Sequence, residues 1–233
     1  MMQTYKDHEG LKKSQKIEAF GDGFSLSKLL QVRSQTLELL QKIADCIKPG
    51  MVEEDAYELA KVMIRESGFE KNWHRPYVRF GANTIKVFGE PSIPGSILGE
   101  NDIFFIDLGP VRDGYEGDAG LTRSIGASGE MSRCASDVKD IFMEVANHWR
   151  KNSVTGAGLY RFAEQSADRR GWKLITDTSG HRLSEFPHQT HFSGSLLEIE
   201  SVPIPNAWVL EIQIRHPEHS YGAFFEDLLL LDE

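Results

Sequence analysis

The stretch from residue 101 to residue 126, NDIFFIDLGPVRDGYEGDAGLTRSIG, carries the pattern on which the rest of the chain depends. Residues 103–106 form a short apolar run that is typical of a buried strand, and Asp107 follows the run. The sequence Arg-Asp-Gly at 112–114 predicts a hairpin turn, because glycine accepts a positive φ. A second strand is then expected to carry Gly117 and Asp118.

Asp107 and Asp118 are eleven residues apart on the two arms of this hairpin, so their carboxylates can face each other. A buried carboxylate is costly without a charged partner, and two close carboxylates raise each other's pKa unless a cation lies between them. A divalent metal ion meets both requirements. The alternative is that both residues are ordinary turn and strand-end residues that face water.

Composition and charge narrow the class of protein. The chain has 233 residues and a net charge of -9, which argues against generic nucleic-acid binding. No stretch approaches the length of a membrane span, and residues 1–20 lack the apolar core of a signal peptide. Cys46 and Cys134 provide neither a disulfide framework nor a paired metal motif. We therefore expect a cytoplasmic protein without a membrane segment, consisting of an N-terminal arm (1–22) and one folded domain (23–233).

Periodicity along the chain predicts an α+β fold. Apolar residues at three- and four-residue steps predict helices over residues 24–47, 53–67, 131–151 and 157–170. Strands are expected over residues 77–80, 83–88, 172–176, 196–200, 207–214 and 224–231, with an irregular loop over 177–195. We expect the helices to lie on one side of a mostly antiparallel sheet.

Two further stretches carry side chains that can bind metal ions. His181 and His188 are seven residues apart in a loop, GHRLSEFPH at 180–188, although both can equally be ordinary loop histidines. Glu211 and Glu226 each lie inside an apolar run, VLEI and FFEDLL. A glutamate in such a strand is seldom left unpaired, although in an alternating strand it can face solvent.

The combined set of candidate ligands is Asp107, Asp118, His181, Glu211 and Glu226. Carboxylate oxygens with one imidazole suit Mn²⁺, Fe²⁺, Co²⁺ or Zn²⁺. Four carboxylates are too many for one ion with an open position, but they suit two divalent ions that share bridging carboxylates. The sequence therefore predicts a site for two metal ions.

The order and spacing of these residues resemble the pita-bread metallopeptidases, which include methionine aminopeptidase, aminopeptidase P, prolidase and creatinase. The resemblance covers residues 31–231, and residues 48–69 resemble the first helical hairpin of the family. It is carried by FFIDLG with Asp107, YEGD with Asp118, GHRLSEFPH with His181 and His188, LEI with Glu211, and FED with Glu226. The resemblance implies the pita-bread fold, a curved and mostly antiparallel sheet covered by helices.

The resemblance also implies how the ligands are shared. Asp107 would chelate one metal ion, Asp118 and Glu226 would bridge both ions, and His181 and Glu211 would bind the second ion. The implied activity is that of an aminopeptidase, in which metal-bound hydroxide attacks a peptide bond near the N-terminus of a short peptide, with Xaa-Pro peptides as one substrate class.

Two catalytic roles follow from the same resemblance. Glu211 would shuttle the proton of the attacking water, in addition to binding metal. His188 would donate a hydrogen bond to the scissile carbonyl or to the oxyanion that forms from it.

Three positions depart from the family pattern. In NTIKVFGEP, methionine aminopeptidases have a catalytic histidine where this chain has Phe88, and phenylalanine cannot hydrogen-bond a peptide amide. His74 or His191 would have to take its place in space. Leu121 stands where the family often has arginine, and Ile212 stands where it usually has proline. None of the three departures removes a metal ligand.

These departures leave two alternatives to a peptidase. One is a catalytically silent relative that keeps the metal site and binds a partner, and the other is a creatinase-like hydrolase of small C–N substrates. His216 and His219 belong either to a loop that lines the substrate cleft or to a solvated hairpin turn. The apolar helix faces are compatible with a homodimer.

Overall fold

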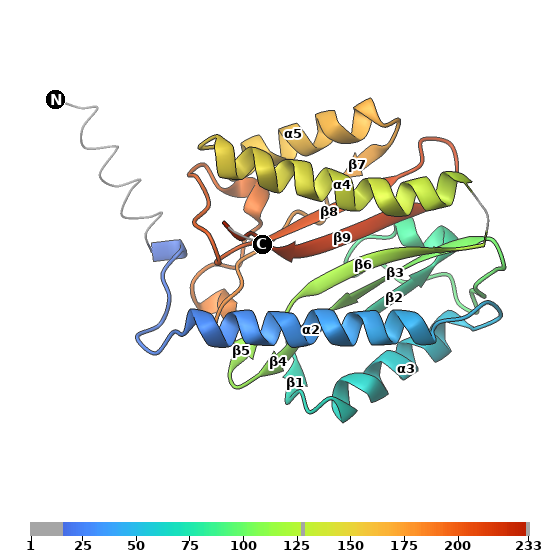
Figure 1. The fold of residues 1–233 in the computed structure, drawn as a ribbon, viewed down its shortest axis with the longest axis horizontal. Helices are drawn as coiled ribbons and strands as arrows, with labels where there is room; N and C mark the ends of the chain where they lie inside the picture. Colours follow the sequence, from blue (N-terminus) through green and yellow to red (C-terminus); the bar gives the residue numbers. More distant parts are fainter. Residues whose placement is uncertain (1–15, 127–128, 232–233) are drawn as a thin grey trace.

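The computed structural model describes residues 16–126 and 129–231, in which helices cover one face of a six-stranded antiparallel sheet (Figure 1). The strands, in spatial order, are β2 (Tyr77–Phe80), β3 (Asp102–Leu108), β6 (Ala119–Ile125), β9 (Gly222–Leu228), β8 (Val209–Arg215) and β7 (Lys173–Ile175). The helices are α2 (Leu26–Cys46), α3 (Glu53–Glu66), α4 (Gly129–Lys151) and α5 (Gly156–Arg169). The four predicted helices and the α+β class are confirmed.

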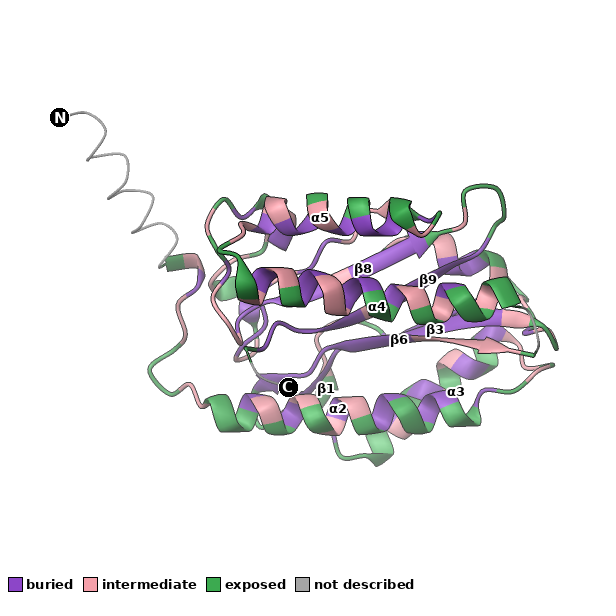
Figure 2. Ribbon diagram, turned by 45° about the horizontal axis from the view of Figure 1, so that its top comes forward, coloured by how far each residue is buried: buried purple, intermediate pink, exposed green. Residues whose placement is uncertain are grey.

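Successive side chains of a strand point to opposite faces of the sheet, so neighbouring residues lie in two different environments. On β3, Phe104 and Ile106 are fully buried in the apolar cluster that includes residues of α2 and α3. Phe105 and Asp107 point to the opposite face and line a cavity. Figure 2 shows buried residues along the sheet and exposed residues on the outer faces of the helices. One face of the sheet therefore builds the core, and the other remains available for chemistry.

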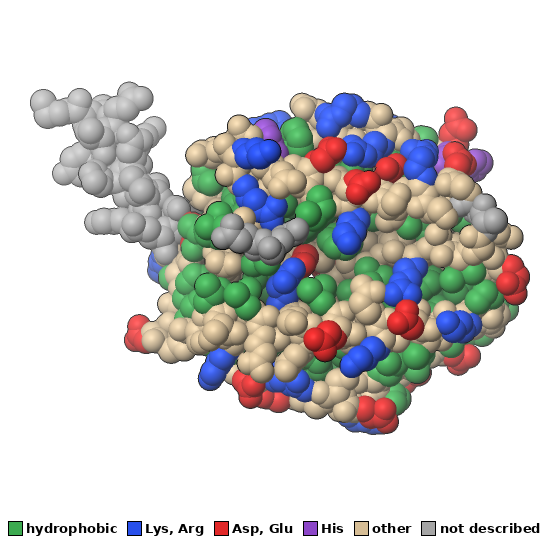
Figure 3. All heavy atoms as spheres, viewed as in Figure 1, with side chains coloured by type: hydrophobic (Ala, Val, Ile, Leu, Met, Phe, Trp, Pro, Cys, Tyr) green, Lys and Arg blue, Asp and Glu red, His purple; other side chains and the backbone are tan. Residues whose placement is uncertain are grey.

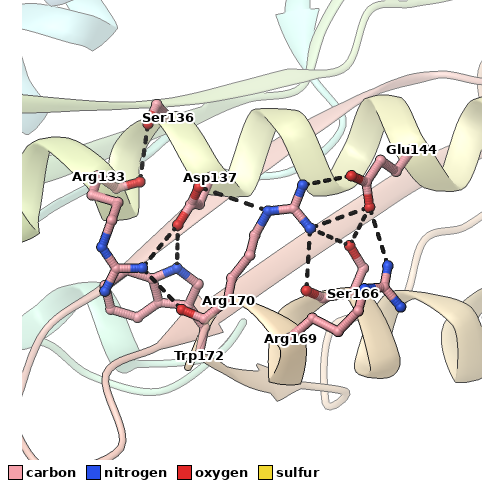
Figure 4. A network of polar contacts seen from close by, with 8 residues as sticks. All are labelled: Arg133, Ser136, Asp137, Glu144, Ser166, Arg169, Arg170 and Trp172. Carbon is pink, nitrogen blue, oxygen red and sulfur yellow. Dashed lines mark hydrogen bonds and ion pairs between the residues drawn. The ribbon is translucent and has the colours of Figure 1, made fainter.

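A polar network joins α4 to α5 and to the start of β7 (Figure 4). The Arg170 guanidinium donates to Glu144 Oε1 at 2.5 Å and to Ser166 Oγ at 2.8 Å. The indole Nε1 of Trp172 donates to Asp137 Oδ2 at 2.7 Å. Since α4 packs on β8 and β9, this network ties the α5–β7 connection to the helix that covers the sheet.

The predicted hairpin turn is confirmed, with Asp113 at φ 52° and Gly114 at φ 74°. It joins β4 (Pro110–Arg112) to β5 (Tyr115–Glu116), which form a separate three-stranded sheet with β1 (Lys71–Asn72). The prediction that Gly117 and Asp118 lie within a strand is wrong, because both lie between β5 and β6. A Cβ at Gly117 would lie 2.0 Å from Thr36 Oγ1, so the chain turns here in close contact with α2.

Two other predicted strands, 83–88 and 196–200, are wrong. Their place is taken by the 3₁₀ helices η1 (Gly81–Ile85) and η3 (Leu196–Glu198). In η1, the Asn83 side chain donates to Glu53 Oε2 at 2.9 Å and accepts from the Ile93 amide at 2.8 Å. A short apolar run cannot reveal such long-range partners, which hold the backbone away from a strand.

Residues 1–15 of the expected N-terminal arm lie outside the described residues. The remaining part contacts the domain, since Glu18 accepts hydrogen bonds from the Ile204 amide at 2.9 Å and from Trp208 Nε1 at 2.8 Å. Lys and Arg are interspersed with Asp and Glu over the helical face (Figure 3). Within the described ranges, none of the helices combines the length and the hydropathy that a membrane span requires.

The network in Figure 4 gives a prediction for stability. Arg170→Ala should lower the free energy of unfolding by about 1–2 kcal/mol, because it removes the short hydrogen bonds from the Arg170 guanidinium to Glu144 and Ser166 in a partly buried site. Arg169→Ala is the matched control, because Arg169 reaches Glu144 only at 3.4 Å from an exposed position, and it should cost about 0.5 kcal/mol or less. Urea unfolding measures both values, and equal losses would contradict the assigned role of Arg170.

Candidate metal centre

The register of four strands places a row of residues on the face of the sheet opposite the helices. Asp107 on β3 pairs with Gly120 on β6, and Gly120 pairs with Glu226 on β9. Glu226 pairs in turn with Glu211 on β8. Since neighbouring strands lie about 4.8 Å apart, three carboxylates share this row. Gly120 leaves it open, because a Cβ there would lie 2.4 Å from the Phe224 ring.

Asp118, which is only 1 % exposed, adds a fourth carboxylate just before β6. His181 Nε2 lies 2.7 Å from Asp118 Oδ2 and 3.7 Å from Glu211 Oε1. His74 Nε2 lies 3.4 Å from Asp107 Oδ1 and 3.6 Å from Asp118 Oδ1. The five residues singled out in the sequence as metal ligands thus converge in the structure, and His74 joins them as a sixth side chain.

Both imidazoles are oriented by the backbone. His181 Nδ1 lies 2.6 Å from the Arg182 carbonyl oxygen, and His74 Nδ1 lies 2.7 Å from the Arg75 carbonyl oxygen. A carbonyl oxygen only accepts hydrogen bonds, so Nδ1 is the protonated nitrogen in both rings. In the neutral rings, Nε2 then turns its lone pair toward the carboxylates, which is the arrangement of a metal-binding histidine.

Several carboxylate oxygens of the centre are buried without a hydrogen-bond donor. In the part of the chain that the structure describes, no group donates to Asp107 Oδ1, Asp118 Oδ1 or Glu226 Oε1. Leaving an ionised carboxylate buried without a partner is costly. Oxygen ligands together with imidazole nitrogen fit divalent transition metals, so the residues present fit the metal ions that the sequence predicts.

The carboxylates do not share one protonation state. Burial, reinforced by the charges of Asp118 and Asp107, raises the pKa of Glu211 to about 7 and the pKa of Glu226 well above its usual range. Burial likewise raises the pKa of Asp107. Asp118 is the exception, because the two neighbouring histidines overcome its burial and lower its pKa to about 2.

The histidines respond in the opposite direction to their burial. Burial alone disfavours a charged imidazolium, but the carboxylates of Asp107 and Asp118 raise the pKa of His74 to about 9. Asp118 and Glu211 raise the pKa of His181 to about 9 in the same way. Without a metal ion, the centre therefore holds protons that a divalent cation would displace.

A cavity of about 330 Å³ opens above the centre. Aromatic side chains form much of its wall, with Tyr77, Phe105 and Phe224 in one buried cluster on β2, β3 and β9. Phe88 also lines the cavity and is 57 % exposed, so it lies at the rim. The cavity combines an apolar wall with a few polar groups at its base, which is the usual composition of a site for a small ligand.

His188 lines the same cavity and is 3 % exposed. Its Nδ1 lies 2.9 Å from Glu116 Oε2, and its backbone N–H donates to Glu116 Oε1 at 3.0 Å. Glu116 therefore fixes the ring, and Nε2 is the ring nitrogen left for the cavity. Glu116 is the glutamate of the YEGD motif at 115–118, and its role behind His188 becomes visible only in the fold.

Two of the three departures from the family pattern lie away from the cavity. Leu121 is buried in the cluster beneath α2, and Ile212 is buried in the cluster beneath α4. Phe88 is the departure that lies at the site, and its ring centroid is 6.1 Å from that of His74. The structure therefore favours His74 over His191 as the histidine near this position, since His191 is not among the described residues that line the cavity.

His216 and His219 lie in the connection between β8 and β9, beside Glu130 at the start of α4. Neither residue is among the described residues that line the cavity. His216 Nε2 is 3.7 Å from Glu130 Oε1, and the side chain of Glu130 is exposed. Of the two interpretations from the sequence, this position fits the hairpin turn.

Comparison with known proteins gives the fold and the family. A methionine aminopeptidase of Clostridium acetobutylicum is 26% identical over 167 residues, which cover 68% of this chain and 64% of that protein. An X-Pro aminopeptidase structure from Thermotoga maritima matches at TM-score 0.71 and 20% identity, over 92% of this chain and 59% of that one. A dipeptidase structure from Pyrococcus horikoshii matches at TM-score 0.76 and 19% identity, over 95% and 60%.

The chain thus spans less than two thirds of the length of each of these three relatives. The solved structures confirm the predicted pita-bread fold of an antiparallel sheet with helices. The family model for metallopeptidase family M24 matches residues 27–233, which is most of the chain. With the aminopeptidase relative and the residues gathered on the sheet, this match shows that the chain belongs to metallopeptidase family M24.

Proposed function

We propose that this chain is an aminopeptidase that uses two divalent metal ions to cleave short peptides near their N-terminus, with Xaa-Pro peptides as one substrate class. The observation that carries the proposal is the row of Asp107, Glu226 and Glu211 across three strands, completed by Asp118 and His181. These side chains lie at the base of a cavity, and several of their oxygens lack a donor within the described residues.

The proposed sharing of ligands follows the order of the row. Asp107 would hold the first ion, His181 and Glu211 would hold the second, and Asp118 and Glu226 would contribute to holding both. The contact between His181 and Asp118 supports this division, as does the position of Glu226 between the strands of the other two carboxylates. The ions, when bound, supply Lewis acidity and lower the pKa of water at the site.

Glu211 is the proposed proton shuttle. Its carboxylate lies at the base of the cavity, where it can take up a proton from water and give it back to the leaving amine. The Tyr160 hydroxyl donates to the Glu211 backbone carbonyl at 3.0 Å, which holds this part of β8 in place.

His188 is the proposed donor to the substrate carbonyl. Glu116 holds the ring through Nδ1, so Nε2 is the nitrogen that can donate to an oxygen in the cavity when it carries hydrogen. A donor held in position before the reaction stabilises negative charge that develops in the transition state.

The aromatic wall supports a substrate with an apolar side chain. Tyr77, Phe105 and Phe224 offer flat apolar surfaces beside Asp107 and Glu226. A proline ring or another compact apolar group matches such a surface, because it buries apolar area without requiring hydrogen bonds.

The second candidate function is a relative that keeps the metal site but does not cleave peptides. Phe88 favours it, because an exposed aromatic ring stands at the cavity rim where methionine aminopeptidases have a histidine. A creatinase-like hydrolase of small C–N substrates is compatible with the same centre.

The first test is metal-dependent peptide hydrolysis. Protein stripped of metal and reloaded with Mn²⁺, Co²⁺ or Zn²⁺ should cleave Met-Ala-Ser or Xaa-Pro peptides, and Asp118→Asn should lower kcat by a factor of about 100 or more. Asp113→Asn is the matched control, because Asp113 is a nearby aspartate in the exposed turn between β4 and β5, and this variant should keep full activity. Equal activity of the Asp118→Asn variant and the wild type would reject the two-metal mechanism. A wild type that binds two ions but cleaves no peptide would favour the second candidate.

A second prediction concerns the hydrogen bond behind His188. Glu116→Gln keeps the size of the side chain but removes its charge, so kcat should fall about tenfold or more while metal content stays unchanged. Glu185→Gln is the control, because Glu185 lies in the same loop as His188 but is not among the described residues that line the cavity. The proposal for His188 would fail if kcat were unchanged in the Glu116→Gln variant.

A third prediction concerns pH and the metal-free protein. His74 and His181 have pKa values of about 9 in the folded chain against 6.5 in the unfolded chain, so their stabilising contribution is complete below pH 6.5 and is lost as pH rises through 9. The pKa of Glu211 is raised from 4.5 to about 7, so its contribution to stability is lost as the pH rises between these two values. The free energy of unfolding should therefore fall between pH 5 and pH 9.

Urea unfolding with a chelator present, at several pH values across this range, measures the effect. Saturating Zn²⁺ should remove or reverse the slope, because metal ions and protons compete for the same side chains. A metal-free protein with constant stability from pH 6.5 to pH 9 would contradict the charged histidine pair.

A further inference from the structure

His74 is part of the described metal centre but not of the ligand set that the sequence resemblance implies. It lies three residues before β2, and its side chain is 6% exposed. Its place depends on Gly109, because a Cβ at that glycine would lie 2.1 Å from His74 Cδ2. The preceding residue is anchored as well, since the Trp73 amide donates to the Gly109 carbonyl at 2.9 Å. The ring is therefore held in position by its surroundings.

The distances from His74 to the carboxylates match a shared metal ion better than direct hydrogen bonds. Its Nε2 lies 3.4 Å from Asp107 Oδ1 and 3.6 Å from Asp118 Oδ1. Hydrogen bonds from nitrogen to oxygen are shorter, at about 2.7–3.2 Å. Two ligand atoms that are each about 2.1 Å from one ion lie about 3.0 Å apart at a right angle and about 3.4 Å apart at the tetrahedral angle. His74 Nε2, Asp107 Oδ1 and Asp118 Oδ1 thus have the spacing of atoms around one ion.

The environment of His74 repeats that of His181. Each Nδ1 faces the carbonyl oxygen of the next residue, which is Arg75 in one case and Arg182 in the other. Each Nε2 faces Asp118, and the two rings approach different oxygens of that carboxylate. Asp118 therefore lies between two similarly oriented imidazoles, although only His181 belongs to the ligand set that the resemblance implies.

The neighbouring groups argue against a role as substrate donor. The two carboxylate oxygens nearest to His74 Nε2 are both buried and have no other donor within the described residues. Phe88, which lies closer to the rim, contacts the His74 ring at a centroid distance of 6.1 Å. The free nitrogen of His74 is thus directed at the ligands of the first ion.

We propose that His74 is a sixth metal ligand, which binds through Nε2 to the ion held by Asp107 and Asp118. This inference rests on the proposed two-metal function. Each ion then has one imidazole ligand, His74 on the first and His181 on the second. A nitrogen ligand on both ions favours Zn²⁺, Co²⁺ or Fe²⁺ over Mn²⁺, which prefers oxygen.

Cobalt binding to the full chain, stripped of metal with a chelator, tests the proposal. The wild type should bind two Co²⁺ ions. His74→Ala should lower the affinity for one of these ions about tenfold or more and should change the visible absorption of the bound cobalt. His181→Ala should likewise lower the affinity for one ion. His191→Ala should behave as the wild type, because His191 is not among the described residues that line the cavity. Circular dichroism establishes that each variant is folded.

Proton NMR of the cobalt-loaded wild type gives a readout that needs no variant to fold. A ligated imidazole whose Nδ1–H is bound to a carbonyl gives a strongly shifted, exchangeable signal, and two such signals are expected. One signal, or unchanged cobalt affinity and absorption in His74→Ala, would overturn the assignment of His74 while leaving the two-metal site intact. A wild type that binds no cobalt would instead overturn the proposed function, and the role of His74 with it.

Discussion

The structure holds several carboxylate side chains close together in the protein interior. Asp107, Glu226 and Glu211 are brought into one row by hydrogen-bonded register, and Asp118 is added beside them where the chain enters β6. Each carboxylate alone would be more stable in water, and their mutual repulsion adds to the cost of burial. Backbone pairing of four strands and the apolar core behind them provide the stability that keeps these residues close, and the two imidazoles offset part of the charge.

The core and the centre are built from the same strands, which explains why the site can be so polar without weakening the fold. On β8, Leu210 and Ile212 are fully buried under α4, while Glu211 faces the centre. On β3, Ile106 is likewise buried in the core, while Asp107 faces the cavity. Because the side-chain period of a strand is two residues, a slip of one residue in any pairing would exchange the two faces. Register is therefore as important for the candidate metal centre as for the core.

The sequence allowed the helices, the Asp113–Gly114 turn and the convergence of five candidate ligands to be predicted, because each depends on local patterns or on motifs with characteristic spacing. It did not allow η1 or η3 to be recognised, because residues such as Asn83 are held by partners that are distant in the chain. Glu116 was missed for the same reason, since its partner is 72 residues away. The sequence offers His74 only as a substitute for the missing histidine, because its short distances to the carboxylates arise from the fold.

The three residues that depart from the family pattern lie in different parts of the structure, and none of them is a candidate metal ligand. Leu121 and Ile212 belong to the core, so their departure from the family pattern changes packing and not the chemistry of the cavity. Phe88 is different, because it replaces a hydrogen-bonding group at the rim by an apolar ring. His188, fixed by Glu116, remains as a hydrogen-bonding side chain in the cavity wall. The cavity therefore combines an apolar ring at its rim, Phe88, with a hydrogen-bonding side chain in its wall, His188.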